Sequence, residues 1–198
     1  MNLNWGLVSG DICEVQCDAI VNAANTTLLG GGGVDGAIHD AAGPELNLFI
    51  RNNVPILGED RIDPTAKVRC QYGMAIITPS FKMKNCKAII HTVGPIWMGG
   101  GRREVGTLMK CYLNCLDTAF VHGFKSVAFP SISTGCFHFP LSLAVEMATH
   151  AVKRWLVEYD NAVRVVFVAH DDETYNEYDC MMEFRARKGG RENELKNK

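Results

Sequence analysis

The sequence predicts an α/β fold in which helices cover both faces of a central sheet, and three observations carry this prediction. Short runs rich in β-branched residues alternate with longer segments of helical periodicity. Several of the short runs are continuously apolar, as strands buried on both faces are. The chain has 198 residues, 47% of them hydrophobic, and neither a Pro/Ser-rich linker nor an internal repeat divides it. We therefore expect one compact domain.

Each expected element has a local reason in the sequence. The apolar runs give the strands, and the segments of helical periodicity between them give the helices. Pro44 and Pro140 lie at the start of two helices, where the first turn tolerates a missing N–H. Strands are expected at residues 5–9, 19–24, 74–78, 88–92, 126–130 and 163–169, and helices at residues 34–42, 44–52, 104–122, 141–159 and 174–187.

Charge and hydropathy exclude several classes of protein. The 20 Lys and Arg residues against 22 Asp and Glu give a net charge of −2, which argues against non-specific nucleic-acid binding. No stretch approaches the roughly 18 uninterrupted apolar residues of a transmembrane helix. The N-terminus lacks the basic and apolar regions of a signal peptide. We expect a cytoplasmic protein without a membrane partner and without nucleic acid as its main partner.

The C-terminal end differs in charge from the rest of the chain. Residues 185–198 contain six basic and two acidic side chains, and they follow the expected domain of residues 1–184. We expect a polar, flexible tail, with a patch for nucleic acid or another anionic partner as the alternative.

The eight cysteines are scattered and do not form a recognisable metal site. Without an export signal, reduced thiols are expected rather than disulfides. Cys13/Cys17 and Cys111/Cys115 lack the CxxC spacing of zinc sites, and the second pair has the i, i+4 spacing of a helix face. We therefore expect these cysteines to pack in the core or at the surface.

A run of four glycines, Gly30 to Gly33, lies directly before the helix expected at residues 34–42. Backbone N–H groups of such a run can approach a phosphate closely, and the helix N-terminus adds roughly half a positive charge. A purely structural loop is the alternative. The match Gly31-x-Gly33-x-x-Gly36 to a dinucleotide fingerprint is weak, because six residues separate it from the preceding strand. The chain has no GxxxxGK[ST] motif of a P-loop enzyme.

Asp35 follows the glycine run at once. A carboxylate in a first helical turn stabilises the helix by about 0.3–1 kcal/mol, which is one interpretation. A bound phosphate would repel this acid, so its presence favours a role in holding a water or a sugar hydroxyl. His39 lies one turn later on the same helix face, and both a catalytic and a packed histidine fit that position.

Three further polar residues are expected at the carboxyl ends of strands, where open α/β sheets bind ligands. Asn22 and Asn25 stand where the strand at residues 19–24 runs out, and Asn25 is expected to point into the crevice. Its amide suits ribose hydroxyls, with turn formation as the alternative. Asp11 ends the first strand and can accept a hydrogen bond from an exocyclic amine such as that of adenine, again with a turn role as the alternative.

Residues 131–139 form a second loop of the same character, after an apolar strand and before a proline-initiated helix. Its small hydroxylated residues and Gly135 can donate hydrogen bonds to phosphate oxygens, and Phe137 or Phe139 can cover a sugar. Cys136 near His138 also allows a nucleophile, although catalytic Cys–His pairs normally come from distant segments. Two such loops can hold one diphosphate.

Five motifs together resemble the macrodomain family, and the MacroD type is the most similar class. They are Gly10-Asp11-Ile12, Asn22-Ala23-Ala24-Asn25, Gly30-Gly31-Gly32-Gly33-Val34-Asp35-Gly36-Ala37-Ile38-His39, His91-Thr92-Val93-Gly94-Pro95 and Pro130-Ser131-Ile132-Ser133-Thr134-Gly135. The resemblance covers about residues 5–182. It implies a three-layer α/β/α domain with a mixed, six-stranded sheet whose cleft binds ADP-ribose.

The resemblance also implies roles for single residues. Asp11 contacts the adenine amino group, and Ile12 makes the neighbouring backbone contact. Asn25 and Asp35 meet the distal ribose, where Asp35 orients or partly deprotonates the attacking water and His39 supports it. The other ligand-binding candidates, most of them around the diphosphate, are Asn22, Gly31, Gly32, Gly33, Val34, Ser133, Thr134, Gly135, Cys136 and Phe137.

Two features depart from the family pattern. After the last strand this class usually places an aromatic residue that packs on adenine, but His170 stands at the matching position. The segment at residues 52–71 is longer than is typical and carries Glu59, Asp60, Arg61 and Asp63. The loops also lack the Cys and His ligands of zinc-dependent macrodomains, so no metal and no redox cofactor are expected.

The resemblance predicts a hydrolase. It is expected to remove mono-ADP-ribose from acidic side chains of proteins and to deacetylate O-acetyl-ADP-ribose. Its partners are then ADP-ribose, O-acetyl-ADP-ribose and mono-ADP-ribosylated proteins. Two alternatives stay open at this point: a module that binds ADP-ribose without turnover, and an RNA-binding or RNA-processing regulatory module, for which only the basic tail speaks.

Overall fold

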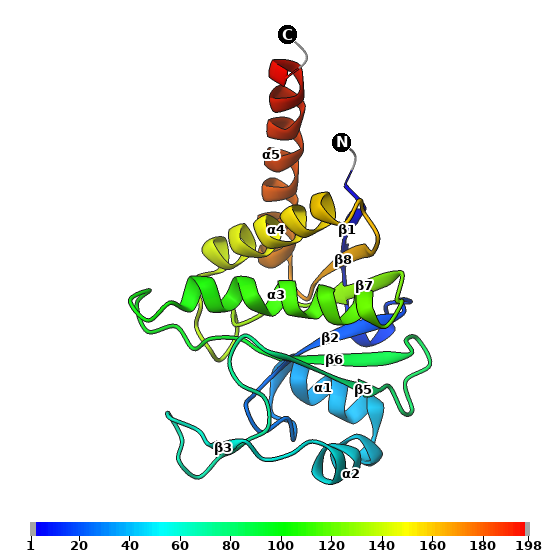
Figure 1. Cartoon of the computed structure of the whole chain (residues 1–198), viewed down its shortest axis with the longest axis vertical. Helices are drawn as coiled ribbons and strands as arrows, with labels where there is room; N and C mark the ends of the chain where they lie inside the picture. Colours follow the sequence, from blue (N-terminus) through cyan, green and yellow to red (C-terminus); the bar gives the residue numbers. More distant parts are fainter. Residues whose placement is uncertain (1–2, 197–198) are drawn as a thin grey trace.

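In the computed structural model, which describes residues 3–196 and the side chains of residues 3–184, six strands form the central sheet. They are β1 (Trp5–Ser9), β2 (Ala19–Ala24), β5 (Ala75–Pro79), β6 (Ala88–Val93), β7 (Ser126–Phe129) and β8 (Arg164–Ala169). Their order is β1-β8-β7-β2-β6-β5, and all neighbours run parallel except β5, which pairs antiparallel with β6 (Figure 1). The sheet is therefore mixed, as predicted.

Helices lie on both faces of this sheet. They are the short 3-10 helix η1 (Ile12–Glu14) and the α-helices α1 (Gly33–Ala42), α2 (Pro44–Asn53), α3 (Glu104–Val121), α4 (Leu141–Glu158) and α5 (Asp172–Lys196). α1 and α2 bury Ile38 and Leu46 in one hydrophobic cluster, and α3, α4 and α5 bury Tyr112, Trp155 and Tyr178 in the other. The predicted three-layer α/β/α fold is confirmed.

The side chains of the central strands alternate between the two clusters. On β2, Ile20 and Ala24 pack under α1 and α2, whereas Ala19 and Val21 pack under α3 and α4. Both faces are covered, so these strands bury apolar residues at nearly every position. This alternation explains why the strands read as continuous apolar runs.

The helices that follow two neighbouring central strands lie on opposite faces of the sheet. β2 and β7 are parallel neighbours, yet β2 leads into α1 on one face and β7 leads into α4 on the other. In open α/β sheets such a point leaves a crevice at the carboxyl ends of the strands, between the two departing loops. The two loops are residues 25–32 and residues 130–140.

Most elements lie where the sequence predicts them, with shifts of one residue at several ends. A short antiparallel pair, β3 (Gly58–Glu59) and β4 (Lys67–Val68), was not predicted and accounts for the long segment at residues 52–71. α5 continues to Lys196, past the predicted end, and projects from the layered body (Figure 1). The basic side chains from residue 185 onward lie outside the described part, so the flexible tail stays a prediction.

Within residues 3–196, none of the helices combines the length and the apolar character that crossing a bilayer requires. The predicted packing of Cys111 and Cys115 is confirmed, because both side chains are buried in the cluster under α3 and α4.

Candidate functional site

Two adjoining cavities occupy the crevice between the loops after β2 and β7. The first has a volume of about 210 Å³ and the second of about 440 Å³, and only together with the second does the first reach the roughly 300–1,000 Å³ of small-molecule sites. Gly33, Val34, Ser131 and Gly135 line both cavities, so the two form one continuous cleft. The first cavity holds Asn25, Asp35 and Phe137, and the second holds Asp11 and His170.

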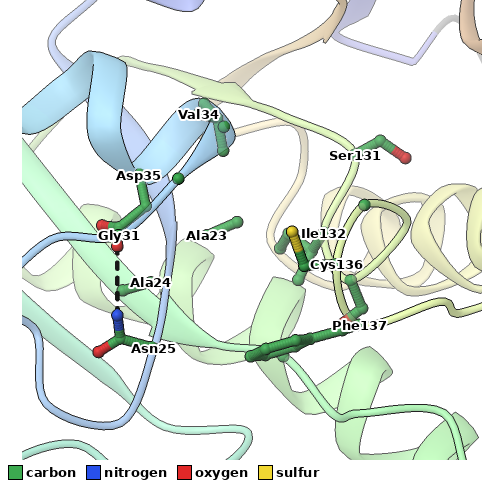
Figure 2. A pocket seen from close by; sticks show the side chains of 15 residues that line it. Ala23, Ala24, Asn25, Gly31, Val34, Asp35, Ser131, Ile132, Cys136 and Phe137 are labelled. Atoms are coloured by element: carbon green, nitrogen blue, oxygen red, sulfur yellow. Dashed lines mark hydrogen bonds between the residues drawn. The ribbon is translucent and has the colours of Figure 1, made fainter.

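Asn25 and Asp35 lie side by side on one wall of the first cavity. Figure 2 shows them across the hollow from Ile132, Cys136 and Phe137, which come from the loop after β7. The Asn25 Nδ2 atom lies 3.5 Å from Asp35 Oδ2 and donates to the Gly30 carbonyl at 2.9 Å. The sequence prediction that Asn25 points into the crevice is therefore confirmed in its geometry.

The amide of Asn25 is held in one orientation. Its Oδ1 atom accepts hydrogen bonds from the Thr27 backbone N–H at 3.0 Å and from the Thr27 hydroxyl at 2.7 Å. Both donors face the oxygen, so the NH₂ group must face Gly30 and Asp35. Asn25 thus stabilises the turn through its oxygen and also lines the cavity.

The two oxygens of Asp35 face different surroundings. Oδ1 accepts a hydrogen bond from Asn22 Nδ2 at 2.7 Å and lies 3.4 Å from His39 Nε2. Oδ2 lies on the cavity side, beside Asn25 and Gly31. Burial raises the pKa of Asp35, and the Asn22 hydrogen bond and the nearby His39 partly oppose this rise. The site therefore presents one carboxylate oxygen to a ligand and anchors the other.

Asn22 differs from its predicted place. Its side chain is fully buried and lines neither cavity, and its Nδ2 atom also lies 3.0 Å from His91 Nδ1. The physical reason is strand periodicity: Asn22 shares a face with Ile20 and Ala24, and that face lies under α1. The prediction that Asn22 contacts the ligand is corrected to a contact with Asp35.

His39 is also buried and lines neither cavity. Burial lowers its pKa, opposed by the charges of Asp35 and Asp40. Its distance of 3.4 Å from Asp35 is that of an ion pair, but neither ring nitrogen forms a hydrogen bond within the described part of the chain. His39 therefore lies next to Asp35 and does not line the cavity.

The amino end of α1 and the loop after β7 present hydrogen-bond donors to the cleft. Gly32 is the N-cap of α1 and provides no side-chain cap, so the first N–H groups of the helix stay open. On the facing loop, Ser131 and Ser133 line the cavity, and the Ser133 hydroxyl is buried without a partner among the described residues. Open N–H groups on one side and an unpaired hydroxyl on the other suit an anion between them.

Close approach of the backbone explains two glycines of the cleft. A Cβ atom at Gly36 would lie 2.7 Å from the Gly31 carbonyl oxygen, so α1 and its preceding loop touch there. A Cβ atom at Gly94 would overlap the Ser133 hydroxyl and lie 2.6 Å from the Ile132 side chain. Glycine at these positions lets the loops come together tightly enough to shape the cleft.

The second cavity contains the residues predicted for an adenine. Asp11 lines it and also caps η1 by accepting from the Cys13 N–H at 2.8 Å, so one of its oxygens serves the turn. Ile12 is buried at its floor, and His170 is exposed at its rim. Of the predicted loop residues, Thr134 lines this second cavity, Gly135 lines both cavities, and Ser133, Cys136 and Phe137 line the first. Phe139 is buried and lines neither cavity.

Cys136 lies in the first cavity without a partner that would activate it. It is an exposed free thiol, and no hydrogen bond among the described residues joins it to His138. No group of three or more His, Cys, Asp or Glu side chains that could hold a metal occurs in the described range.

A family model described as Macro domain matches residues 21–148, which include both loops of the cleft. The chain is a macrodomain. It is 44% identical over 172 residues to an O-acetyl-ADP-ribose deacetylase of Salmonella newport, with 87% of this chain and 90% of that protein covered. The predicted family is therefore confirmed.

Solved macrodomains have the same fold. A macrodomain of Oceanobacillus iheyensis with ADP is 37% identical, with a TM-score of 0.80 and coverage of 92% of this chain and 91% of that one. A macrodomain of Trypanosoma brucei in complex with ADP-ribose is 33% identical, with a TM-score of 0.75 and coverage of 90% and 69%.

The macrodomain cleft also contains residues that sequence reasoning missed. Asp171 and Thr174 line the second cavity, where Asp171 accepts from the Thr174 N–H at 2.7 Å at the start of α5. An acid two residues after the end of a strand and three residues before a threonine is a helix-start signal that could have located them. Gly94 lines the first cavity, but its close approach to another loop has no local signal.

A third cavity of about 330 Å³ lies apart from the cleft. It is formed by the β3–β4 hairpin together with Thr26, Gln71 and Tyr72, and it shares no residue with the other two. Within it, Asp60 accepts from the Ile62 N–H at 2.7 Å, so this acid serves the turn of the hairpin.

Proposed function

We propose that this macrodomain binds ADP-ribose and hydrolyses bonds at its distal ribose. The substrates are O-acetyl-ADP-ribose and mono-ADP-ribose linked to acidic side chains of proteins. The observation that carries the proposal is the Asp35 carboxylate, which is buried, anchored through Oδ1 and open to the cavity through Oδ2 beside two anion-binding loops. The name of the Salmonella relative and the ADP-ribose complex of the Trypanosoma macrodomain support it.

The cleft offers a separate region for each of three parts of the ligand. Asp11, Ile12 and His170 would take the adenine in the second cavity. The amino end of α1 and the loop at residues 131–137 would hold the diphosphate at the junction of the two cavities. The distal ribose would then lie in the first cavity against Asn25 and Asp35. Binding energy from adenine and diphosphate would position the bond that reacts.

The reaction needs water and groups of this chain. A water held between the diphosphate and the distal ribose attacks, and its proton passes to Asp35 Oδ2. The water oxygen bonds to the acyl carbon as the bond between this carbon and the ribose oxygen breaks, and Asp35 returns the proton to the departing ribose oxygen. The products are the carboxylic acid and a ribose hydroxyl, and the donors of the two loops stabilise the negative charge that develops. A basic Asp35 favours this step, and burial raises its pKa in that direction.

Two hydrolysis assays with matched variants test the proposal. The native chain, Asp35→Ala and Asp40→Ala are incubated with O-acetyl-ADP-ribose and with a glutamate-linked mono-ADP-ribosylated protein, and released acetate and ADP-ribose are measured. Asp35→Ala is expected to lose activity by on the order of 10²–10⁴ while still binding ADP-ribose. Asp40 is exposed on the same helix and lines neither cavity, so Asp40→Ala should retain activity.

The outcomes separate the enzyme from a binding module. If the native chain binds ADP-ribose but releases no product from either substrate, it is a non-catalytic module and the proposal is wrong. Release from O-acetyl-ADP-ribose alone would restrict the proposal to small substrates. The cytoplasmic location and the modified proteins that serve as substrates stay predictions.

A further inference from the structure

Three polar residues lie in a row under α1, on strands that are otherwise apolar on that face. Asn22 on β2 is the register partner of His91 on β6, and Thr78 on the edge strand β5 follows on the same side. Asn22 and His91 are fully buried, and Thr78 is 2% exposed. A buried polar side chain costs free energy unless it is hydrogen-bonded, whereas a buried apolar side chain needs no partner. The presence of three polar residues in this layer therefore requires an explanation.

The row is a continuous chain of hydrogen bonds that ends at Asp35. The Asn22 Nδ2 atom lies 2.7 Å from Asp35 Oδ1 and 3.0 Å from His91 Nδ1. The His91 Nε2 atom lies 3.0 Å from the Thr78 hydroxyl, which in turn lies 3.1 Å from the Pro79 carbonyl. A carbonyl only accepts, so the Thr78 hydroxyl donates to Pro79 and accepts from His91 Nε2–H.

These contacts fix the protonation of every member. His91 Nε2 carries the proton, so the neutral ring accepts at Nδ1, and both protons of the Asn22 amide are then directed to Asp35 and His91. The Asn22 Oδ1 atom is left buried without a partner among the described residues. An orientation that leaves this oxygen unpaired is unfavourable for stability alone, and it is consistent with a requirement at Asp35.

We propose that Asn22, His91 and Thr78 are positioning residues, which hold Asp35 Oδ1 so that Oδ2 stays directed at the reacting water. The inference rests on the proposed function, because the gain from a fixed Oδ2 appears only in the reaction. Thr78 sets the tautomer of His91, His91 sets the orientation of the Asn22 amide, and that amide anchors the carboxylate. None of the three lines the cleft.

The groups that face Asp35 determine how its protonation responds. They are Asn22 from β2, Asn25 from the loop and His39 from its own helix; His91 of β6 lies behind Asn22, and Asp40 acts through His39. The Asn22 hydrogen bond lowers the pKa of Asp35. Its loss would raise that pKa, and the acid limb of the pH–kcat profile would move to higher pH.

The test compares Thr78→Val with Thr78→Ser and Thr92→Val. Serine keeps the hydroxyl of Thr78. Thr92 is a fully buried threonine on the other face of the sheet whose hydroxyl donates to the Met74 carbonyl at 2.8 Å, and it lines neither cavity. Thr78→Val and Asn22→Ala are expected to lower kcat on O-acetyl-ADP-ribose by on the order of tenfold or more, with the Kd of ADP-ribose unchanged. Thr78→Ser and Thr92→Val should keep the native kcat.

A second measurement does not depend on turnover. The ¹³C resonance of the Asp35 carboxyl, assigned by its loss in Asp35→Asn, is titrated in the native chain and in Asn22→Ala, and a higher pKa is expected in the variant. The inference is overturned if the native chain is active and Asn22→Ala keeps its kcat and pH profile, or if kcat and ADP-ribose affinity fall together. If the native chain is inactive, the proposed function fails, and an unchanged Asp35 titration in Asn22→Ala overturns the inference by itself.

Discussion

A Cβ atom on Gly31 would stand 3.0 Å from Oδ2 of Asp35. The same atom would lie 3.2 Å from Asn25 Nδ2, so any side chain at this position crowds both polar groups on the wall of the first cavity. The backbone of Gly31 does not need a positive φ, so alanine fits the loop conformation. We expect Gly31→Ala to reduce kcat by on the order of tenfold or more while the free energy of unfolding changes by less than about 1 kcal/mol.

The control for Gly31→Ala is Gly101→Ala. Gly101 is exposed in the loop before α3, and a Cβ atom there would meet nothing within 4 Å. Kinetics on O-acetyl-ADP-ribose and urea unfolding of both variants check the prediction. Native kcat in Gly31→Ala would show that the Asp35–Asn25 pair tolerates displacement, contrary to the arrangement proposed for the reaction.

Burial of His91 makes the stability of the fold depend on pH. It lowers the pKa of His91 from 6.5 to about 3, and the nearby His39 adds to the effect. The unfolded chain therefore binds a proton below pH 6.5 that the folded chain does not, and stability falls as the pH falls from about 7 towards 3. Between pH 7.5 and pH 5.0 we expect His91 to reduce the free energy of unfolding by about 2 kcal/mol.

Urea unfolding of the native chain and of His91→Gln at pH 7.5 and pH 5.0 isolates the contribution of His91 to the pH dependence of stability. The comparison cancels the contributions of His39, whose pKa is also lowered, and of Asp35, whose raised pKa acts in the opposite direction. His91→Gln should be less stable at pH 7.5 but lose less stability on acidification. Equal losses in the two proteins would mean that His91 is protonated in the folded state.

An aromatic residue at position 170 should improve binding. His170 lines the second cavity at the carboxyl end of β8, where an adenine is proposed to lie. A phenyl ring offers a larger face for stacking than an imidazole, so His170→Phe is expected to lower the Kd of ADP-ribose by roughly fivefold, or about 1 kcal/mol. Calorimetry with ADP-ribose measures the change, with His150→Phe on the exposed face of α4 as the control. Weaker binding by His170→Phe would place the adenine elsewhere.

Gly94 and Gly106 predict opposite effects of the same substitution. A Cβ atom at Gly94 would overlap the Ser133 hydroxyl, so Gly94→Ala is expected to destabilise the fold by about 1–3 kcal/mol and to weaken ADP-ribose binding. Gly106 is exposed within α3 and a Cβ atom there would meet nothing within 4 Å, so Gly106→Ala should stabilise by roughly 0.5–1 kcal/mol. Thermal unfolding in the presence and absence of ADP-ribose measures both effects. A neutral Gly94→Ala would mean that the loop after β7 moves aside freely.

The sequence predicts the fold closely because its signals are local. The apolar runs at β1 and β2 and the proline at the start of α2 each mark an element boundary without reference to the rest of the chain. The glycine loop at residues 30–33 and Asp35 can also be identified from the sequence alone. An acid next to a helix terminus that binds an anion would be repelled by that anion, so its presence indicates a functional role.

Features that depend on contacts between distant segments could not be predicted from the sequence. The period of two along β2 places Asn22 with Ile20, but its partner His91 comes from a strand that only the folded sheet brings alongside. The need for glycine at position 94 depends on Ser133, which lies in another loop. Such requirements leave no pattern within either segment alone.

The divergence of the chain after β2 and β7 has a mechanical consequence. The hollow exists because one loop departs towards α1 and the other towards α4, so no side chain has to move to create it. A diphosphate held by both loops would connect the two outer layers across the cleft. We therefore expect bound ligand to raise the free energy of unfolding of the whole domain. This increase should grow with the logarithm of the free ligand concentration.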